Sequence, residues 1–93
     1  MKRNISAEGN SSLKRQIAKE LQALLVEIGC CRLNQIRMSV NLREDLGIDS
    51  FTGLEILVAI EKRYGFRVSE REFNQIVTFE DIVGFVSKKL GKQ

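Results

Sequence analysis

Ser50 lies in the stretch of the chain that is best suited to chemistry. Gly47 is a typical turn residue, Asp49 is a favoured helix N-cap, and an apolar run with helical periodicity follows directly. Ser50 is therefore expected in the first turn of a helix, exposed to solvent. The backbone N–H groups and the positive dipole end of that helix favour an anion there, such as a phosphate diester.

Ser50 is not expected to act as a catalyst. A hydroxyl nucleophile needs an adjacent base, most often histidine, and the chain contains no histidine. The Gly-x-Ser-x-Gly elbow of hydrolases is also absent. Asp45 and Asp49 do not form a calcium-binding loop, because Ile56 occupies the closing position of that motif. We predict no catalytic residue and no metal site, and we expect another enzyme to modify Ser50.

The surroundings of Ser50 resemble the attachment motif of acyl carrier proteins. The matching letters are Asp45-Leu46-Gly47-Ile48-Asp49-Ser50, then Leu54-Glu55, then a helix that closes at Tyr64-Gly65. The resemblance runs from about Leu13 to Leu90. It implies a covalent 4'-phosphopantetheine arm on Ser50, whose terminal thiol holds an acyl group as a thioester. The alternative is that Ser50 only caps a helix.

The resemblance also implies partners. A phosphopantetheinyl transferase would load the arm from coenzyme A, and acyl-loading and acyl-processing enzymes such as a ketosynthase or an acyltransferase would use it. In the family, such enzymes recognise the helix that starts at the serine. The positions that match here are Asp45, Asp49, Phe51, Leu54, Glu55, Val58 and Glu61.

The helix expected from about Ser50 to Tyr64 has two apolar sides. One side is sufficient for a core and holds Gly53, Ile56, Leu57, Ile60 and Tyr64. Phe51, Leu54 and Val58 lie nearly opposite, among acidic residues. A second apolar stripe beside acids is typical of a surface on which partners dock. The preceding loop could instead fold over these residues, and for Leu54 both interpretations remain open.

The remaining periodicity predicts an all-α, small four-helix bundle over residues 11–91, with three longer helices and one short helix. A flexible N-terminal arm over residues 1–10 and a tail over 92–93 would flank it. The first helix would start at Ser11 or Ser12 and end at Gly29. Ser69 and Thr78 each begin a capping motif, which predicts the short helix and a last helix closing at Gly91.

The connection between the first two helices is long. Ile36, Met38, Val40 and Leu42 alternate with polar residues, which taken alone predicts a strand. No second strand is present to pair with it, and a single strand is not stable. We therefore expect a long loop whose apolar residues are pinned over the core. Acyl carrier proteins have a loop of this kind.

The composition is that of one soluble domain. The 93 residues are 43% hydrophobic and 29% charged. No run could span a membrane, and the N-terminus lacks the apolar segment of a signal peptide, so we expect a cytoplasmic monomer. Cys30 and Cys31 are adjacent, which would strain a bridge between them, and they are too few for a zinc site.

The net charge of +3 is unevenly distributed. Both ends of the chain are basic, whereas residues 43–61 hold five acids against Arg43. An acidic surface around Ser50 would steer basic partners towards it. Lys62 and Arg63 follow where carriers of general fatty acid synthesis have acids, so we expect a specialised pathway such as polyketide, unusual lipid or cell-envelope synthesis. The alternatives are a peptidyl or aminoacyl carrier, or a small basic helical adaptor for nucleic acid or protein. For the carrier, no nucleic-acid partner is expected.

Overall fold

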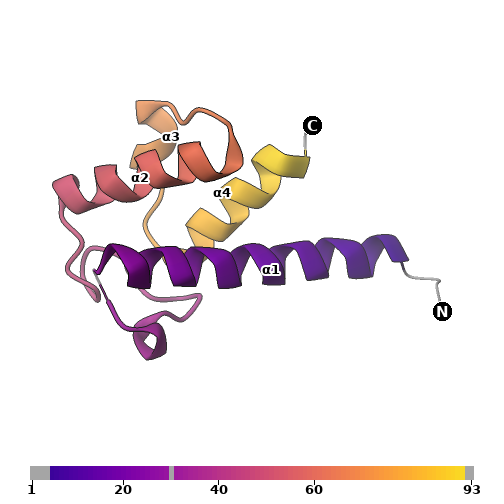
Figure 1. The fold of residues 1–93 in the computed structure, drawn as a ribbon, viewed down its shortest axis with the longest axis horizontal. Coiled ribbons are helices and arrows are strands. Elements are labelled where there is room, and N and C mark those ends of the chain that lie inside the picture. The colour runs from indigo at the N-terminus through magenta and orange to yellow at the C-terminus, as the bar shows by residue number, and fades with distance from the viewer. Residues whose placement is uncertain (1–4, 30, 92–93) are drawn as a thin grey trace.

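A bundle of helices makes up the part of the chain that the computed structural model describes, which is residues 5–29 and 31–91, with side chains from Ser12 onward. The elements are α1 (Ile5–Ile28), the 3-10 helix η1 (Leu33–Gln35), α2 (Ser50–Tyr64), α3 (Glu70–Asn74) and α4 (Phe79–Gly91). Within the described ranges no strand occurs, and one isolated antiparallel bridge joins Asn41 to Thr78. The prediction of an all-α fold with three longer helices, one short helix and a long first loop is confirmed (Figure 1).

The helix α1 begins earlier than expected. It starts at Ile5 instead of Ser11 or Ser12, so the predicted start is wrong and most of the expected arm is helical. Serine and glycine disfavour helix only moderately, and no proline interrupts the segment. Figure 1 shows this half of α1 projecting past the other helices. Leu13, in this half of the helix, is 38% exposed. Residues 1–4, 92–93 and Cys30 lie outside the described residues.

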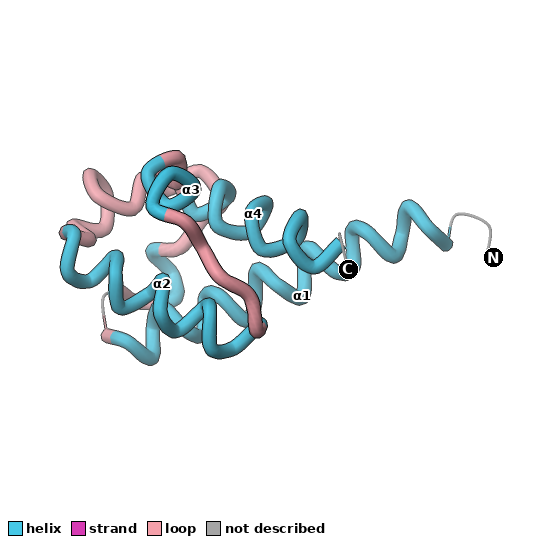
Figure 2. The backbone as a smooth tube through the Cα atoms, turned by 90° about the horizontal axis from the view of Figure 1, so that it is seen from above, coloured by secondary structure: helices cyan, strands magenta, loops and turns pink. Residues whose placement is uncertain are grey.

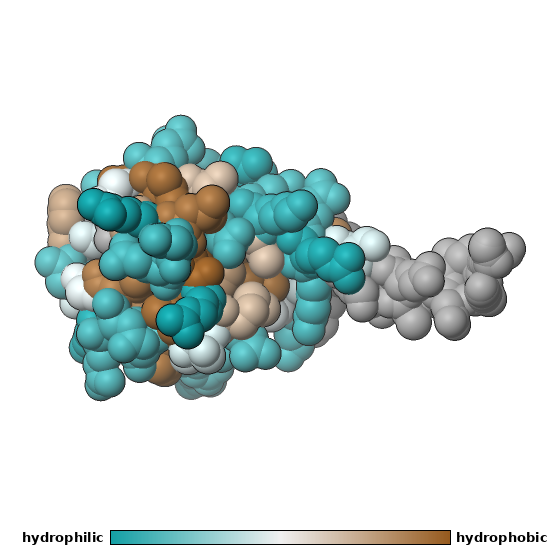
Figure 3. Space-filling model, turned by 90° about the horizontal axis from the view of Figure 1, so that it is seen from below, coloured by the Kyte–Doolittle hydropathy of each residue, from teal (hydrophilic) through white to brown (hydrophobic). Residues whose placement is uncertain are grey.

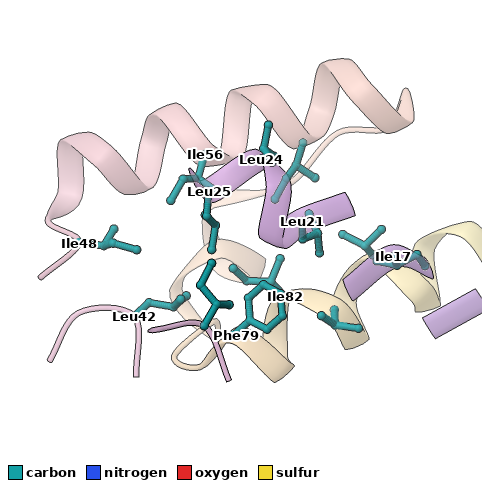
Figure 4. Packing of buried hydrophobic residues seen from close by; sticks show 13 residues of the cluster. Ile17, Leu21, Leu24, Leu25, Leu42, Ile48, Ile56, Phe79 and Ile82 are labelled. Carbon is teal, nitrogen blue, oxygen red and sulfur yellow. The ribbon is translucent and has the colours of Figure 1, made fainter. Parts of the chain in front are cut away.

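The core lies where α1 packs against α4 and α2. Figure 4 shows side chains from all three helices and from the first loop pointing towards one another. Phe79 and Val86 of α4 are completely buried, and Ile17 of α1 is 1% exposed. The other buried apolar residues are Leu21, Leu24, Leu25, Ile36, Leu42, Ile48, Ile56, Ile60, Ile82 and Val83. Cys31 packs half-buried against this cluster.

The long first loop is pinned against the start of α4. The Leu42 backbone N–H donates to the Val77 carbonyl at 3.0 Å, and the Phe79 N–H donates to the Val40 carbonyl at 3.1 Å. Ile36 and Leu42 are buried. The alternating pattern therefore marks a loop, as predicted, in which Ile36, Val40 and Leu42 reach the core, whereas Met38 is 43% exposed.

The helix ends follow the expected capping chemistry. Ser69 and Glu72 form a reciprocal capping box at α3, with backbone-to-side-chain distances of 2.9 and 3.1 Å. Gly65 ends α2 with a φ of +76°, a conformation that glycine adopts without strain. Figure 2 shows the segment after Gly65 crossing from the end of α2 to α3.

A side-chain contact fastens the far end of α2 to α1. The Tyr64 hydroxyl donates to Glu20 Oε1 at 2.6 Å. Burial, and then the Glu20 carboxylate, raise the pKa of Tyr64 to about 12. Arg63 Nε lies 3.9 Å from the same carboxylate oxygen. This end of α2 is thus held by polar contacts, whereas its middle is held by apolar packing.

We predict that Gly84→Ala stabilises the protein. Gly84 lies inside α4, and a Cβ built there meets no atom within 4 Å. Alanine should therefore raise the free energy of unfolding by about 0.5–1 kcal/mol through helix propensity alone. Urea denaturation measures the change. Gly53→Ala is the matched control, because its Cβ would lie 3.1 Å from Phe73 Cζ and the ring would have to shift, offsetting the gain. A stabilisation equal to that of Gly84→Ala would contradict this account of Gly53.

Candidate functional site

Ser50 is the first residue of α2 and is exposed. The preceding residue, Asp49, has extended backbone angles and accepts a hydrogen bond from the Thr52 backbone N–H on its Oδ1 at 2.9 Å. This is the N-cap predicted from the sequence. Because the helix begins at Ser50, the serine hydroxyl stands beside the positive end of the helix dipole. The predicted placement of Ser50 is confirmed.

A tight turn fixes the chain just before the serine. Gly47 has a φ of +69°, which favours glycine. Ile48 is buried, and its backbone N–H donates to the Leu42 carbonyl at 3.0 Å. The Asp45 Oδ2 accepts from the Asn41 backbone N–H at 2.8 Å. Ile48 is therefore anchored in the core only two residues before Ser50. The fold itself fixes the backbone position of Ser50, and no partner is needed to hold it.

An apolar groove of about 520 Å³ opens beside Ser50. It is walled by α2 on one side and by α3 and the start of α4 on the other, with Phe73 lying against Gly53. Its apolar lining consists of Leu42, Ile48, Ile56, Leu57, Ile60, Phe73, Ile76, Val77 and Ile82. The contribution of Phe73 and Val77 was not predicted. The signal in the sequence was Gly53, which leaves room on the core face of α2 for an aromatic ring.

The second apolar stripe of α2 faces solvent. Phe51, Leu54 and Val58 are 73%, 52% and 47% exposed. The preceding loop does not cover them, because it is pinned against α4 instead. The interpretation of Leu54 as a buried contact of this loop is therefore wrong. Next to the serine, the helix therefore presents three exposed apolar side chains on one face.

The four acidic residues that were expected to recognise partners differ in their exposure and in their hydrogen bonds. Glu55 is exposed on the same helix as the apolar stripe. Asp45 and Asp49 are also exposed, but each accepts a backbone hydrogen bond that shapes the turn before α2. Glu61 is half-buried and accepts from the Val68 backbone N–H at 2.8 Å, which holds the segment after α2. The bond of Asp49 is the predicted cap, whereas sequence reasoning missed the bonds of Asp45 and Glu61.

Other chemistry is not assembled in the described residues. No group of three or more cysteine or acidic side chains that could hold a metal ion occurs in them. No helix in the described part of the chain is long and apolar enough to cross a bilayer. The exposed serine, the groove and the apolar stripe of α2 are the features that converge at one place.

Comparisons with known proteins agree with this geometry. The family described as "Phosphopantetheine attachment site" matches residues 15–86. Polyketide-8 synthase acyl carrier protein 2 of Streptomyces avermitilis is 30% identical over 73 residues, which cover 78% of this chain and 84% of that protein. The acyl carrier protein of Phytoplasma australiense is 28% identical over 74 residues, covering 80% of this chain and 97% of that protein.

The family match spans most of the bundle and includes the serine turn and α2. The chain belongs to the phosphopantetheine attachment family, whose members are carriers and not catalysts. The predicted resemblance to acyl carrier proteins and the predicted cofactor, covalent 4'-phosphopantetheine, are confirmed. The site suits this group, because an exposed hydroxyl at a helix N-terminus can carry a phosphate diester and an apolar groove lies beside it.

We predict that the Asp49 cap makes stability depend on pH. The hydrogen bond from the Thr52 backbone N–H lowers the pKa of Asp49 from its ordinary value of 3.8. A lowered pKa in the folded state adds stability above the unfolded value, and this stability is lost as the pH falls through the folded value. Asp49→Ala should therefore lower the urea midpoint at neutral pH, and the gap to the wild type should narrow below pH 3.8.

Asp49→Asn is the matched control for this titration. Asparagine also caps helices but does not ionise, so its urea midpoint should exceed that of Asp49→Ala even in acid. A gap between wild type and Asp49→Ala that stayed constant through the acid range would show that the carboxylate charge contributes nothing to the cap.

Proposed function

We propose that Ser50 is the residue that carries 4'-phosphopantetheine and that the protein works as an acyl carrier. The observation that carries this proposal is the exposure of the Ser50 hydroxyl at the first position of α2, inside the region that matches the family. The Asp49 carboxylate beside it is engaged in the helix cap, where the hydrogen bond from the Thr52 backbone N–H lowers its pKa, and the chain contains no histidine. The reaction that modifies Ser50 must therefore be catalysed by a separate transferase.

The roles of the residues follow from their positions. Ser50 Oγ forms the bond to phosphorus and replaces the phosphoanhydride oxygen of coenzyme A, whose nucleotide leaves, while the hydroxyl proton passes to the transferase. The helix dipole and the N–H groups at the start of α2 favour the resulting diester. When bound, the arm supplies a thiol that holds acyl groups as thioesters. Asp49 keeps the helix start in place through its bond to Thr52.

The groove beside Ser50 supports a sheltering role for the bundle. Its lining is mostly apolar and also includes the exposed residues Asp49 and Ser50. α3 contributes no buried residue and is held mainly by the Phe73 ring against Gly53 and by a 3.1 Å salt bridge between Glu72 and Lys89. An element held by so few contacts can move at small cost. We propose that the acyl chain on the arm enters this groove while the carrier is not bound to an enzyme.

The exposed stripe of α2 is the proposed docking surface for partner enzymes. Phe51, Leu54 and Val58 supply apolar area, and Glu55 supplies charge for a basic partner. Asp45, Asp49 and Glu61 add negative potential while they serve the fold. The proposed partners are a phosphopantetheinyl transferase and acyl-handling enzymes such as a ketosynthase or an acyltransferase.

We further propose that the carrier serves a specialised pathway and not general fatty acid synthesis. Lys62 and Arg63 place positive charge at the end of α2, and the relative from Streptomyces avermitilis is named as a polyketide synthase carrier. Both polyketide and unusual-lipid synthesis fit this pattern, and a peptidyl or aminoacyl carrier is the alternative within the class. We also propose that the carrier acts as a monomer in the cytoplasm. Its carrier domain would span residues 11–91, and α1 extends beyond this domain towards the N-terminus.

We predict that a broad-specificity phosphopantetheinyl transferase modifies the full chain once. After incubation with coenzyme A, intact mass should rise by one phosphopantetheine in the wild type and in Ser39→Ala, which removes another exposed serine. Ser50→Ala should gain nothing, because Ser50 carries the exposed hydroxyl at the first position of α2, whereas Thr52 in the same turn is half-buried. An unchanged mass of the folded wild type would contradict the carrier proposal and favour the basic adaptor. A gain that persists in Ser50→Ala would assign the arm to another serine.

We predict that Leu54→Ser slows this modification. Leu54 is 52% exposed in the centre of the proposed docking surface, and apolar residues at such places contribute about 1–2 kcal/mol to binding, or roughly tenfold in kcat/KM. Initial rates can be followed by mass. Leu33→Ser is the matched control, since Leu33 is 58% exposed on η1, away from Ser50. Equal rates for the two variants would argue against docking on α2.

A further inference from the structure

A second exposed apolar surface lies away from Ser50. It consists of Val26 on α1, Leu33 on η1 and Met38 in the loop that follows, and we call it the underside patch. These side chains are 39%, 58% and 43% exposed. Figure 3 views the molecule from this side and shows brown apolar residues gathered among polar ones. The carrier function proposed above does not use this surface.

Hydrogen bonds hold the underside patch together. Gln22 Nε2 donates to the Ile36 carbonyl at 3.2 Å, so the loop segment between Leu33 and Met38 rests on the outer face of α1. Val26 lies one turn further along that same face of α1. The Met38 carbonyl accepts from the Glu80 backbone N–H at 2.9 Å, which ties the other end of the segment to α4. The apolar side chains are therefore presented by fixed backbone.

The charges around the underside patch are mainly positive. Arg32 and Arg37 are exposed in the loop, one on each side of η1. Arg15 and Lys19 are exposed on the face of α1 that leads to Val26, by helical spacing. Two exposed acids are also near: Glu27 is next to Val26 in sequence, and Glu80 binds the Met38 carbonyl through its backbone N–H. Four basic side chains thus accompany the apolar residues, in contrast to the acidic surface around Ser50.

The underside patch includes a part of the chain that projects from the bundle. No residue of η1 is buried, and Figure 1 shows η1 standing out from the bundle below α1. Neither the groove beside Ser50 nor the second groove, between α3 and α4, is lined by Val26, Leu33 or Met38. A partner helix or peptide binds best in a groove. An apolar protrusion flanked by arginines is better suited to a soft, negatively charged surface.

We propose that the underside patch binds the surface of anionic lipid bilayers. Leu33 and Met38 would enter the boundary between headgroups and acyl chains, and Arg32 and Arg37 would pair with lipid phosphates. Because α2 lies on the other side of α1 from η1 in Figure 1, binding leaves the docking surface of α2 free. The binding is peripheral and reversible, and it does not depend on the attachment of the arm to Ser50.

Vesicle flotation with the full chain tests this proposal. At low salt the protein should float with vesicles of phosphatidylcholine mixed with phosphatidylglycerol and should not float with phosphatidylcholine alone. Raising the salt should release it, because surface charges are screened. Leu33→Ser should weaken binding severalfold. The double change Arg32→Gln with Arg37→Gln should weaken it by about tenfold or more, since each basic residue near an anionic surface contributes substantially.

Two matched controls separate this surface from general stickiness. Leu54→Ser removes a leucine of similar exposure from α2, and Lys62→Gln with Lys88→Gln removes two exposed positive charges elsewhere. Both should bind vesicles like the wild type. Equal losses in the controls and the patch variants would overturn the proposal, as would failure of the wild type to float at low salt. The latter result would favour an acidic protein as the occupant.

Discussion

The burial of Phe79 between α1 and α4 is the contact on which the rest of the structure depends. Phe79 is fully buried, and as the first residue of α4 it also donates its backbone N–H to Val40 in the first loop. One residue thus fixes both the core and the path of the loop. The loop in turn places Ile48 in the core, and Ser50 follows two residues later. The position of the serine is therefore a consequence of hydrophobic packing elsewhere in the bundle.

Much of the fold was predictable because its signals are local. The caps at Asp49, Ser69 and Thr78, and the glycine that ends α2, depend on residues within one turn. The start of α1 was not predictable in the same way, since serine and glycine disfavour helix only moderately. The outcome there depends on whether the helix continues from the strong helical segment beyond Ser12. The sequence therefore predicted the presence of each helix more reliably than its length.

The site itself was predictable in part. The spacing of Phe51, Leu54 and Val58 identified the exposed stripe, because helical periodicity separates two faces of one helix. The groove required knowledge of which residues meet across the fold, such as Phe73 and Gly53, which are twenty positions apart. Likewise, nothing local to Glu61 indicates that it binds the backbone of Val68. A periodic sequence pattern shows which residues share one face of a helix. The residues that this face contacts are known only from the tertiary structure.

The bridge between Asn41 and Thr78 joins segments that are far apart in the chain. It can form only once the loop has reached the start of α4, where Phe79 and Glu80 donate their backbone N–H groups to the Val40 and Met38 carbonyls. The turn that displays Ser50 follows directly from that bridge. A transferase that recognises this turn would therefore modify folded chains and would leave unfolded or damaged chains unmodified. Covalent loading would then double as quality control, committing cofactor only to chains that are already able to use it.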